Sequence, residues 1–430
     1  MGTAKNISNE SDQRPPFAAF TNHQIPEKFQ TLPTPCYVID EGQLHQNGQL
    51  LADIAQRCGC KILLAQKAFS NYDFYPILNE YLAGTEASGL FEAKLGKEMM
   101  PDKEVHVFCG AYREDEFEEL LKTADHIVFN SPRQLEKFGF RAKASGKSIG
   151  LRINPECSTQ EGHDIYDPCA QGSRLGTTRA VWDNEMTPEL IALLDGLHFH
   201  TLCEQDSDAL ETTLNAVEEK FGFFLSRMKW LNMGGGHHIT RLDYDIKRLE
   251  KCIKRAQDTW NLQVYLEPGE ACALNAGFLV TRVLDILTNG DTRIAILDSS
   301  ATCHMPDVIE MPYTPPLFGA KIWINKAPTD AVSSGTEAGN MIKKSNSEGL
   351  IYRLAGPTCL AGDVIGEYSF SHELREGDLL VFGDMAIYTT CKNNTFNGMP
   401  LPNIWKRSKD GSLVQLTHFG YGDFKMRLGS

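Results

Sequence analysis

The sequence lacks the hallmarks of membrane, secreted and nucleic-acid-binding proteins. It has no run of about 18 apolar residues, so no membrane-spanning helix is expected. The polar N-terminal stretch lacks the apolar segment of a secretory signal, which favours a cytoplasmic protein. Lysine and arginine number 42 against 56 aspartates and glutamates, and the formal charge of −14 argues against nucleic acid as a partner. This acidity suits a cationic ligand, or simply solubility.

The twelve cysteines also lack the spacing of a metal site. No Cys-x-x-Cys pair is present, and Cys58 and Cys60 form the only close pair. Cys303 and His304 are adjacent but have no partners at ligand spacing, so no metal is expected. We interpret the cysteines as reduced thiols, most of them small buried apolar residues.

At 430 residues the chain suits two domains. Eight short β-rich runs alternate with amphipathic stretches over residues 43–275, which favours a (β/α)8 barrel, with a doubly wound open sheet as the alternative. The eight runs are Lys61–Gln66, Gly84–Ala87, Val105–Cys109, His126–Asn130, Ile149–Asn154, Gly196–Thr201, Trp230–Met233 and Val264–Glu267.

After about residue 275 the pattern changes to strands separated by turns, which predicts a C-terminal all-β domain over residues 276–430. A strand within residues 29–42, at Pro35–Asp40, could join this sheet. We expect residues 1–28 to be a mobile tail and residues 326–348, rich in Ser, Gly, Asn and Lys, to be a flexible insertion.

Chemically informative residues fall at the carboxyl ends of the predicted barrel strands, where such barrels carry their active sites. They are Lys67, His200, the run Gly234, Gly235 and Gly236, and Glu267. A partly desolvated lysine can form a Schiff base, consecutive glycines let backbone N–H groups cradle a phosphate, and a buried carboxylate can hold a pyridine nitrogen protonated. Each residue alone has an ordinary structural explanation, but together they indicate a pyridoxal-phosphate (PLP) site.

The predicted β domain contains a second group of candidates. Cys359 and Asp363 lie in a turn-rich stretch, where a thiol can serve as a general acid, and the Tyr388 hydroxyl could donate to a phosphate. Taken alone, Cys359 could equally be another buried thiol.

These motifs resemble the fold-type III PLP decarboxylases, the alanine-racemase-fold group that includes ornithine and diaminopimelate decarboxylases. The resemblance spans about residues 33–428 and includes GPTCLAGDVIGEY and NNTFNG. It is strongest to the carboxynorspermidine decarboxylase branch, through GLHFHTLCEQ and CHMPDVIEMPY. It implies a homodimer that decarboxylates carboxynorspermidine, carboxyspermidine or both to norspermidine or spermidine. Diaminopimelate, ornithine or arginine decarboxylation, a racemase, and a non-enzymatic PLP-binding protein are the alternatives.

The resemblance also implies a role for each candidate residue. Lys67 would hold PLP, His200 would stack on its ring, Glu267 would pair with the ring nitrogen, Arg152 would support Glu267 or the ring environment, and the glycines with Tyr388 would bind phosphate. Cys359, supplied by the partner subunit, would protonate the carbanion. Relatives usually read EPGR where this chain reads EPGE, so Glu270 cannot bind phosphate as an arginine would. The candidates for binding the substrate ammonium groups are Glu204, Glu270, Asp307, Glu310 and Asp363.

Overall fold

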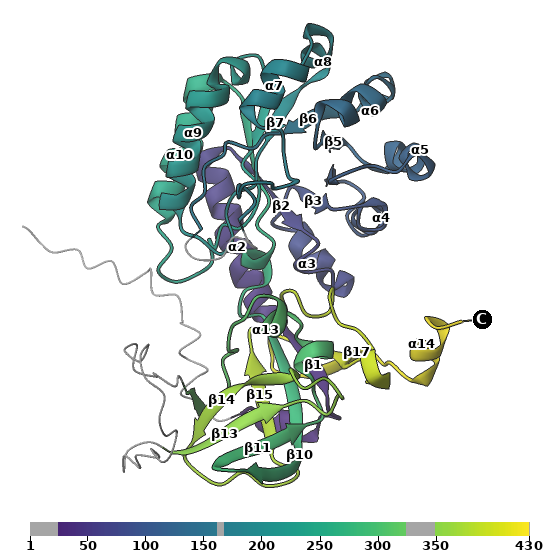
Figure 1. Cartoon of the computed structure of the whole chain (residues 1–430), viewed down its shortest axis with the longest axis vertical. Helices are drawn as coiled ribbons and strands as arrows, with labels where there is room; N and C mark the ends of the chain where they lie inside the picture. The colour runs from purple at the N-terminus through teal and green to yellow at the C-terminus, as the bar shows by residue number, and fades with distance from the viewer. Residues whose placement is uncertain (1–24, 161–166, 324–348, 430) are drawn as a thin grey trace, which may run out of the picture.

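The computed structural model describes residues 25–160, 167–323 and 349–429 (Figure 1). Residues 1–24 of the expected tail and the whole expected insertion 326–348 lie outside the described residues. Residues Glu27–Thr31, at the end of the expected tail, form a 3-10 helix whose Phe29 is buried. Within the described ranges, no helix is long and apolar enough to cross a membrane.

Eight parallel strands close into a barrel, because the first strand, β2, pairs with the last, β9. This closure confirms the predicted barrel and excludes the open sheet. The strands are β2 Lys61–Ala65, β3 Gly84–Ala87, β4 Glu104–Phe108, β5 His126–Phe129, β6 Ser148–Arg152, β7 Gly196–His198, β8 Trp230–Asn232 and β9 Gln263–Leu266.

Helices cover the outside of the barrel and bury one apolar face each. In the first, Asp40 caps the N-terminus by accepting the Gln43 N–H, and Gly59 ends the helix with φ +63°. The helices are α2 Glu41–Cys58, α3 Tyr75–Asn79, α4 Leu90–Met99, α5 Glu114–Thr123, α6 Pro132–Ala144, α7 Arg179–Glu185, α8 Pro188–Leu193, α9 Ser207–Leu225, α10 Ile246–Trp260 and the short α11 Glu270–Ala273.

The second domain is a sheet in the order β12-β14-β13-β11-β10-β1-β16-β17, with β15 also pairing with β10. The strands are β1 Cys36–Asp40, β10 Gly277–Asn289, β11 Thr292–Leu297, β12 Ala320–Ile322, β13 Leu350–Ala355, β14 Val364–Phe370, β15 Leu379–Gly383, β16 Asn403–Arg407 and β17 Leu413–Thr417. The N-terminal strand joins this sheet as predicted, antiparallel to β10 and parallel to β16. Three short helices accompany it, α12 Ala301–His304, α13 Asp307–Glu310 and α14 Tyr421–Met426.

The two domains meet at the carboxyl ends of the barrel strands. The chain leaves β15 and returns to the barrel, where the Tyr388 N–H donates to the Ala68 carbonyl at 2.9 Å. The Thr390 hydroxyl bonds Asn71, 319 residues away in the sequence, and Arg407 pairs with Asp40. Side chains from the sheet domain therefore reach the end of the barrel that carries the functional site.

Candidate active site

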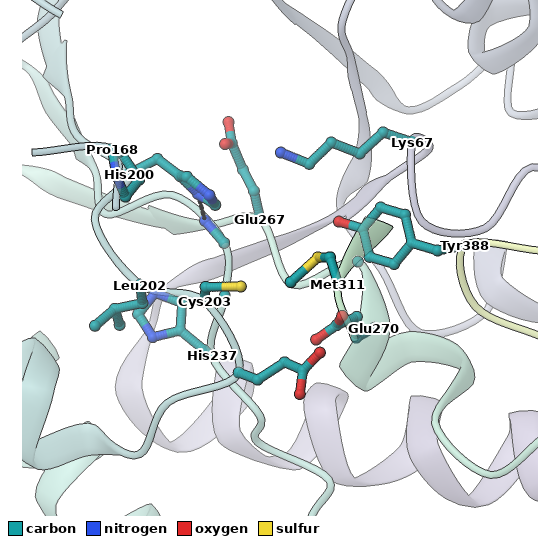
Figure 2. A pocket seen from close by; sticks show the side chains of 14 residues that line it. Lys67, Pro168, His200, Leu202, Cys203, His237, Glu267, Glu270, Met311 and Tyr388 are labelled. Atoms are coloured by element: carbon teal, nitrogen blue, oxygen red, sulfur yellow. Dashed lines mark hydrogen bonds between the residues drawn. The ribbon is translucent and has the colours of Figure 1, made fainter. Parts of the chain in front are cut away.

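A cleft at the carboxyl ends of the barrel strands brings together most of the residues that the sequence singled out (Figure 2). Those residues are Lys67, His200, Glu204, Gly235, Gly236, Glu267, Glu270 and Tyr388. Figure 2 shows the Lys67 amine pointing across the cleft toward the Glu267 carboxylate, with the Tyr388 hydroxyl on the same side as Lys67. An amine, a buried acid and a phenol therefore face one cleft.

The Glu267 carboxylate follows β9 and is fixed by two hydrogen bonds. Its Oε2 lies 3.1 Å from Nε2 of His198, and Asn232 donates its amide to Oε1. Burial alone would raise the pKa of Glu267, but the interactions with His198 and the charge of Lys67 lower it below the ordinary value. The site thus holds an ionised carboxylate in a fixed orientation.

The His200 ring is held as a neutral imidazole. Its Nδ1 accepts the Gly235 N–H at 2.8 Å, while burial and then the positive charges of Lys67 and Arg152 lower its pKa well below the usual range. Arg152 supports this arrangement by donating to the His200 carbonyl at 3.0 Å, and it stacks over the Phe108 ring. Arg152 therefore acts on His200 and its surroundings rather than by a hydrogen bond to Glu267.

The glycine run is engaged more with the protein than the sequence indicates. The Gly234 N–H donates to Asn232 and the Gly235 N–H to His200, whereas the Gly236 N–H has no hydrogen-bond partner among the described residues. A Cβ at Gly236 would lie 2.0 Å from the Leu202 carbonyl oxygen, and its φ is +78°. The glycines are thus required by close backbone packing, and the Gly236 N–H is the one of the three available to an anion.

Three residues of this region have left-handed backbones that side chains seldom adopt, with φ of +52° at Glu204, +55° at Asp384 and +47° at Tyr388. Such strain clusters at functional sites because the surrounding structure must enforce it. Burial, and then the charge of Glu270, raises the pKa of Tyr388 well above the usual range, so its hydroxyl remains a donor.

One wall of the cleft is formed by two carboxyl groups, those of Glu204 and Glu270. Burial, and next the charge of Glu204, raises the pKa of Glu270 well above its ordinary value. The charge of Asp384, a residue that the sequence does not single out, also raises the pKa of Glu270. Burial raises the pKa of Asp384 itself to about 6. No arginine is among the described residues that line the cleft. The wall therefore favours a cationic ligand.

The remaining candidates lie elsewhere. Asp307 and Glu310, on α13, both pair with Lys392, and Asp307 also contributes to the field at Glu270. Asp363 is buried, and its two carboxylate oxygens accept hydrogen bonds from Ser300, Thr302 and Thr358. Cys359 is exposed and does not line the cleft of its own chain.

Glu86, at the end of β3, is a buried carboxyl group that the sequence does not single out. Burial, followed by the charge of Glu267, raises its pKa to about 8. The two neighbouring acids therefore differ: Glu267 is ionised and Glu86 holds its proton at neutral pH. Environments that separate two carboxyl pKa values in this way are typical of acid–base sites.

Replacing Glu86 by Gln should raise stability more at high pH than at low pH. An unfolded glutamate ionises near 4.5, whereas folded Glu86 keeps its proton to about 8, so the unfolded chain binds fewer protons between these values. Stability then falls by up to about 1.4 kcal/mol per pH unit in this window, and Gln removes that loss. The melting-temperature difference between variant and wild type should grow from pH of about 5 to about 8. The exposed control Glu98→Gln should show no such growth, and a constant difference for Glu86→Gln would contradict the assignment.

Comparison with known proteins agrees with this geometry. The family model described as "Pyridoxal-dependent decarboxylase, C-terminal sheet domain" matches residues 36–386. A carboxynorspermidine/carboxyspermidine decarboxylase of Campylobacter jejuni is 43% identical over 93% of this chain and 99% of its own, and a carboxyaminopropylagmatine decarboxylase of Synechocystis is 38% identical over 94% and 97%. The crystal structure of carboxynorspermidine decarboxylase from Campylobacter jejuni complexed with norspermidine covers 92% of this chain and 100% of its own, with 42% identity and a TM-score of 0.80. The chain belongs to the pyridoxal-dependent decarboxylase family.

Proposed function

We propose that this protein is a PLP-dependent decarboxylase of a carboxylated polyamine, namely carboxynorspermidine, carboxyspermidine or both. The observation that carries the proposal is that Glu204 and Glu270 line the same cleft as Lys67, with the charge of Asp384 acting on Glu270, and that the described lining has no arginine. The distal ammonium groups of a triamine need such carboxylates. Diaminopimelate carries a distal carboxylate, which this wall would repel.

The cleft fits PLP by the chemistry of its donors. The Lys67 amine would hold the aldehyde, the ionised Glu267 would face the ring nitrogen, and the flat, neutral His200 would pack on the ring. The free Gly236 N–H and the Tyr388 hydroxyl would donate to the phosphate. When bound, PLP supplies an electron-poor ring that takes up the electron pair left by departing CO2.

The protein side chains would perform the remaining steps. Glu267, anchored by His198 and Asn232, would keep a proton at the ring nitrogen. The acidic wall would hold the amine chain so that the α-carboxylate is the group that leaves. The Cys359 thiol would then deliver a proton to the α-carbon in place of the carboxylate.

The exposed position of Cys359 supports a homodimer with shared sites. Its thiol lies outside the cleft of its own chain, and the neighbouring Leu360 and Phe396 side chains are 44% and 45% exposed. Apolar side chains in such a position are typical of an interface. We infer that a second copy covers this surface and receives Cys359 in its cleft.

The decisive experiment is a substrate panel on purified protein, in which the released amine is measured. We expect turnover of carboxynorspermidine or carboxyspermidine and little of diaminopimelate, ornithine or arginine. Carboxyaminopropylagmatine belongs in the panel because a 38% identical relative bears that name. Turnover of diaminopimelate alone would overturn the substrate class, and cofactor binding without any decarboxylation would favour a non-enzymatic protein.

Replacing Glu270 by Gln should weaken use of the triamine substrate. Gln keeps the size of the side chain but cannot become the carboxylate that a bound ammonium group would pair with. Hydrogen bonds to charged groups contribute about 1.5–3 kcal/mol, so kcat/KM should fall by about 10- to 100-fold, mainly through KM. The exposed Glu373→Gln is the matched control. An unchanged KM would remove Glu270 from the amine-binding site.

A further inference from the structure

The loop that carries Cys359, residues 356–363, is anchored firmly at its base. The buried Asp363 accepts the Ser300 hydroxyl at 2.9 and 3.0 Å and the Thr302 N–H at 3.2 Å. The Thr358 hydroxyl donates to the same carboxylate at 2.7 Å, and the Gly356 N–H to the Asp363 carbonyl at 2.9 Å. These bonds fix both ends of the loop to the start of α12 and leave its tip projecting outward.

A second loop, residues 393–398 of the NNTFNG motif, is anchored to the same short helix. The side-chain amide of Asn394 donates to the Thr302 carbonyl at 2.9 Å, and the backbone N–H of Asn394 donates to the Cys303 carbonyl at 3.0 Å. The Phe396 N–H is held by the Asn394 side chain at 3.0 Å. The helix α12 therefore sets the position of the Cys359 loop and of the NNTFNG loop together.

One side chain connects the two loop tips directly. The Cys359 N–H donates to Oδ1 of Asn397 at 2.6 Å. Asn397 has a left-handed backbone, φ +60°, which asparagine tolerates better than most residues. The Cys359 thiol has no hydrogen-bond partner among the described residues. The position of Cys359 therefore depends on the hydrogen bond from its backbone N–H to Asn397.

We propose that Asn397 is a positioning residue that fixes the Cys359 backbone, so that the thiol keeps a constant position and direction. The inference rests on the proposed role of Cys359 as the proton donor. Because small displacements of a reacting group cost large factors in rate, we expect loss of this bond to act on kcat and not on cofactor binding.

Two substitutions separate the hydrogen bond from the backbone conformation. Asn397→Gly keeps the left-handed backbone but removes the acceptor, and Asn397→Asp keeps an acceptor. In the holoenzyme we expect Asn397→Gly to lower kcat by about 10- to 100-fold with KM within about 2-fold, and Asn397→Asp to recover most of the loss. Asn261, left-handed at the end of α10, provides the control Asn261→Gly, which should leave kcat unchanged.

A readout independent of activity is the alkylation rate of Cys359, followed by iodoacetamide labelling and peptide mass spectrometry. We expect this rate to change in Asn397→Gly and to return toward the wild-type value in Asn397→Asp. An unchanged alkylation rate with a lowered kcat would overturn the assignment, and so would equal kcat losses in the Gly and Asp variants.

Cys359→Ala separates the role of Asn397 from the role of Cys359, and the substrate panel tests the proposed function by itself. If Cys359→Ala turns over normally, Cys359 is not the proton donor and the role of Asn397 fails with it, whereas the proposed decarboxylation stands. If Cys359→Ala is impaired, Asn397→Gly in the Cys359→Ala background should cause little further loss, because the two residues act through one group. An undiminished further loss would overturn only the role of Asn397.

Discussion

Lys67→Ala should abolish turnover and remove the visible absorption that a lysine-linked pyridoxal gives. Lys67 projects from the turn after β2 into the cleft, toward Glu267, and it is the one lysine among the described lining residues. The substitution removes both the proposed attachment point of the cofactor and an amine able to transfer protons. Loss of a proton-transfer group alone costs about 10²- to 10⁴-fold, so we expect a loss of at least this size.

Two controls make the Lys67 experiment specific. Lys67→Arg keeps the positive charge beside Glu267 but cannot form the same linkage, so it should be as inactive as Lys67→Ala. Lys122→Ala, on an exposed position of α5, should retain both activity and absorbance. A Lys67→Ala protein with the wild-type absorption spectrum would refute the assignment of this lysine.

Cys359→Ala should lower kcat by about 10²- to 10⁴-fold while the protein retains its cofactor, because it removes the proposed proton donor and none of the proposed cofactor contacts. Cofactor content and absorbance of the purified variant measure the second part of this expectation. Cys109→Ala, at a half-buried thiol beyond β4, is a suitable control and should keep its activity. Near-normal turnover with the correct product would exclude Cys359 as the acid.

The same variant tests whether two subunits share each site. When inactive Lys67→Ala and Cys359→Ala proteins are mixed and allowed to exchange subunits, half of the dimers are mixed and each has one site free of both substitutions. Activity should therefore recover to about one quarter of the wild-type value. Absence of any recovery, although mixed dimers form, would show that Cys359 serves its own chain.

The barrel could be predicted because its strands are short apolar runs that alternate with amphipathic stretches, and the residues at their ends follow from the sequence order. The sequence pattern does not reveal two strands of the sheet domain, β14 and β16, because they mix polar and apolar residues, as in VIGEYSF and NIWKR. Position along the chain also does not reveal which carboxylates face one another. The charge of Asp384 acts on Glu270, whereas Asp363, a candidate amine ligand, accepts hydrogen bonds from Ser300 and Thr358 that anchor the Cys359 loop.

The hydrogen bonds from Tyr388 to Ala68 and from Thr390 to Asn71 join an early and a late segment of the chain, which are synthesised at different times. Lys67 is synthesised early, whereas Tyr388, which lines the same cleft, is added only near the end of synthesis. A chain that ends before Tyr388 therefore lacks one of the residues that line the cleft. A chain that is terminated before residue 388 should therefore contain Lys67 but bind pyridoxal phosphate weakly.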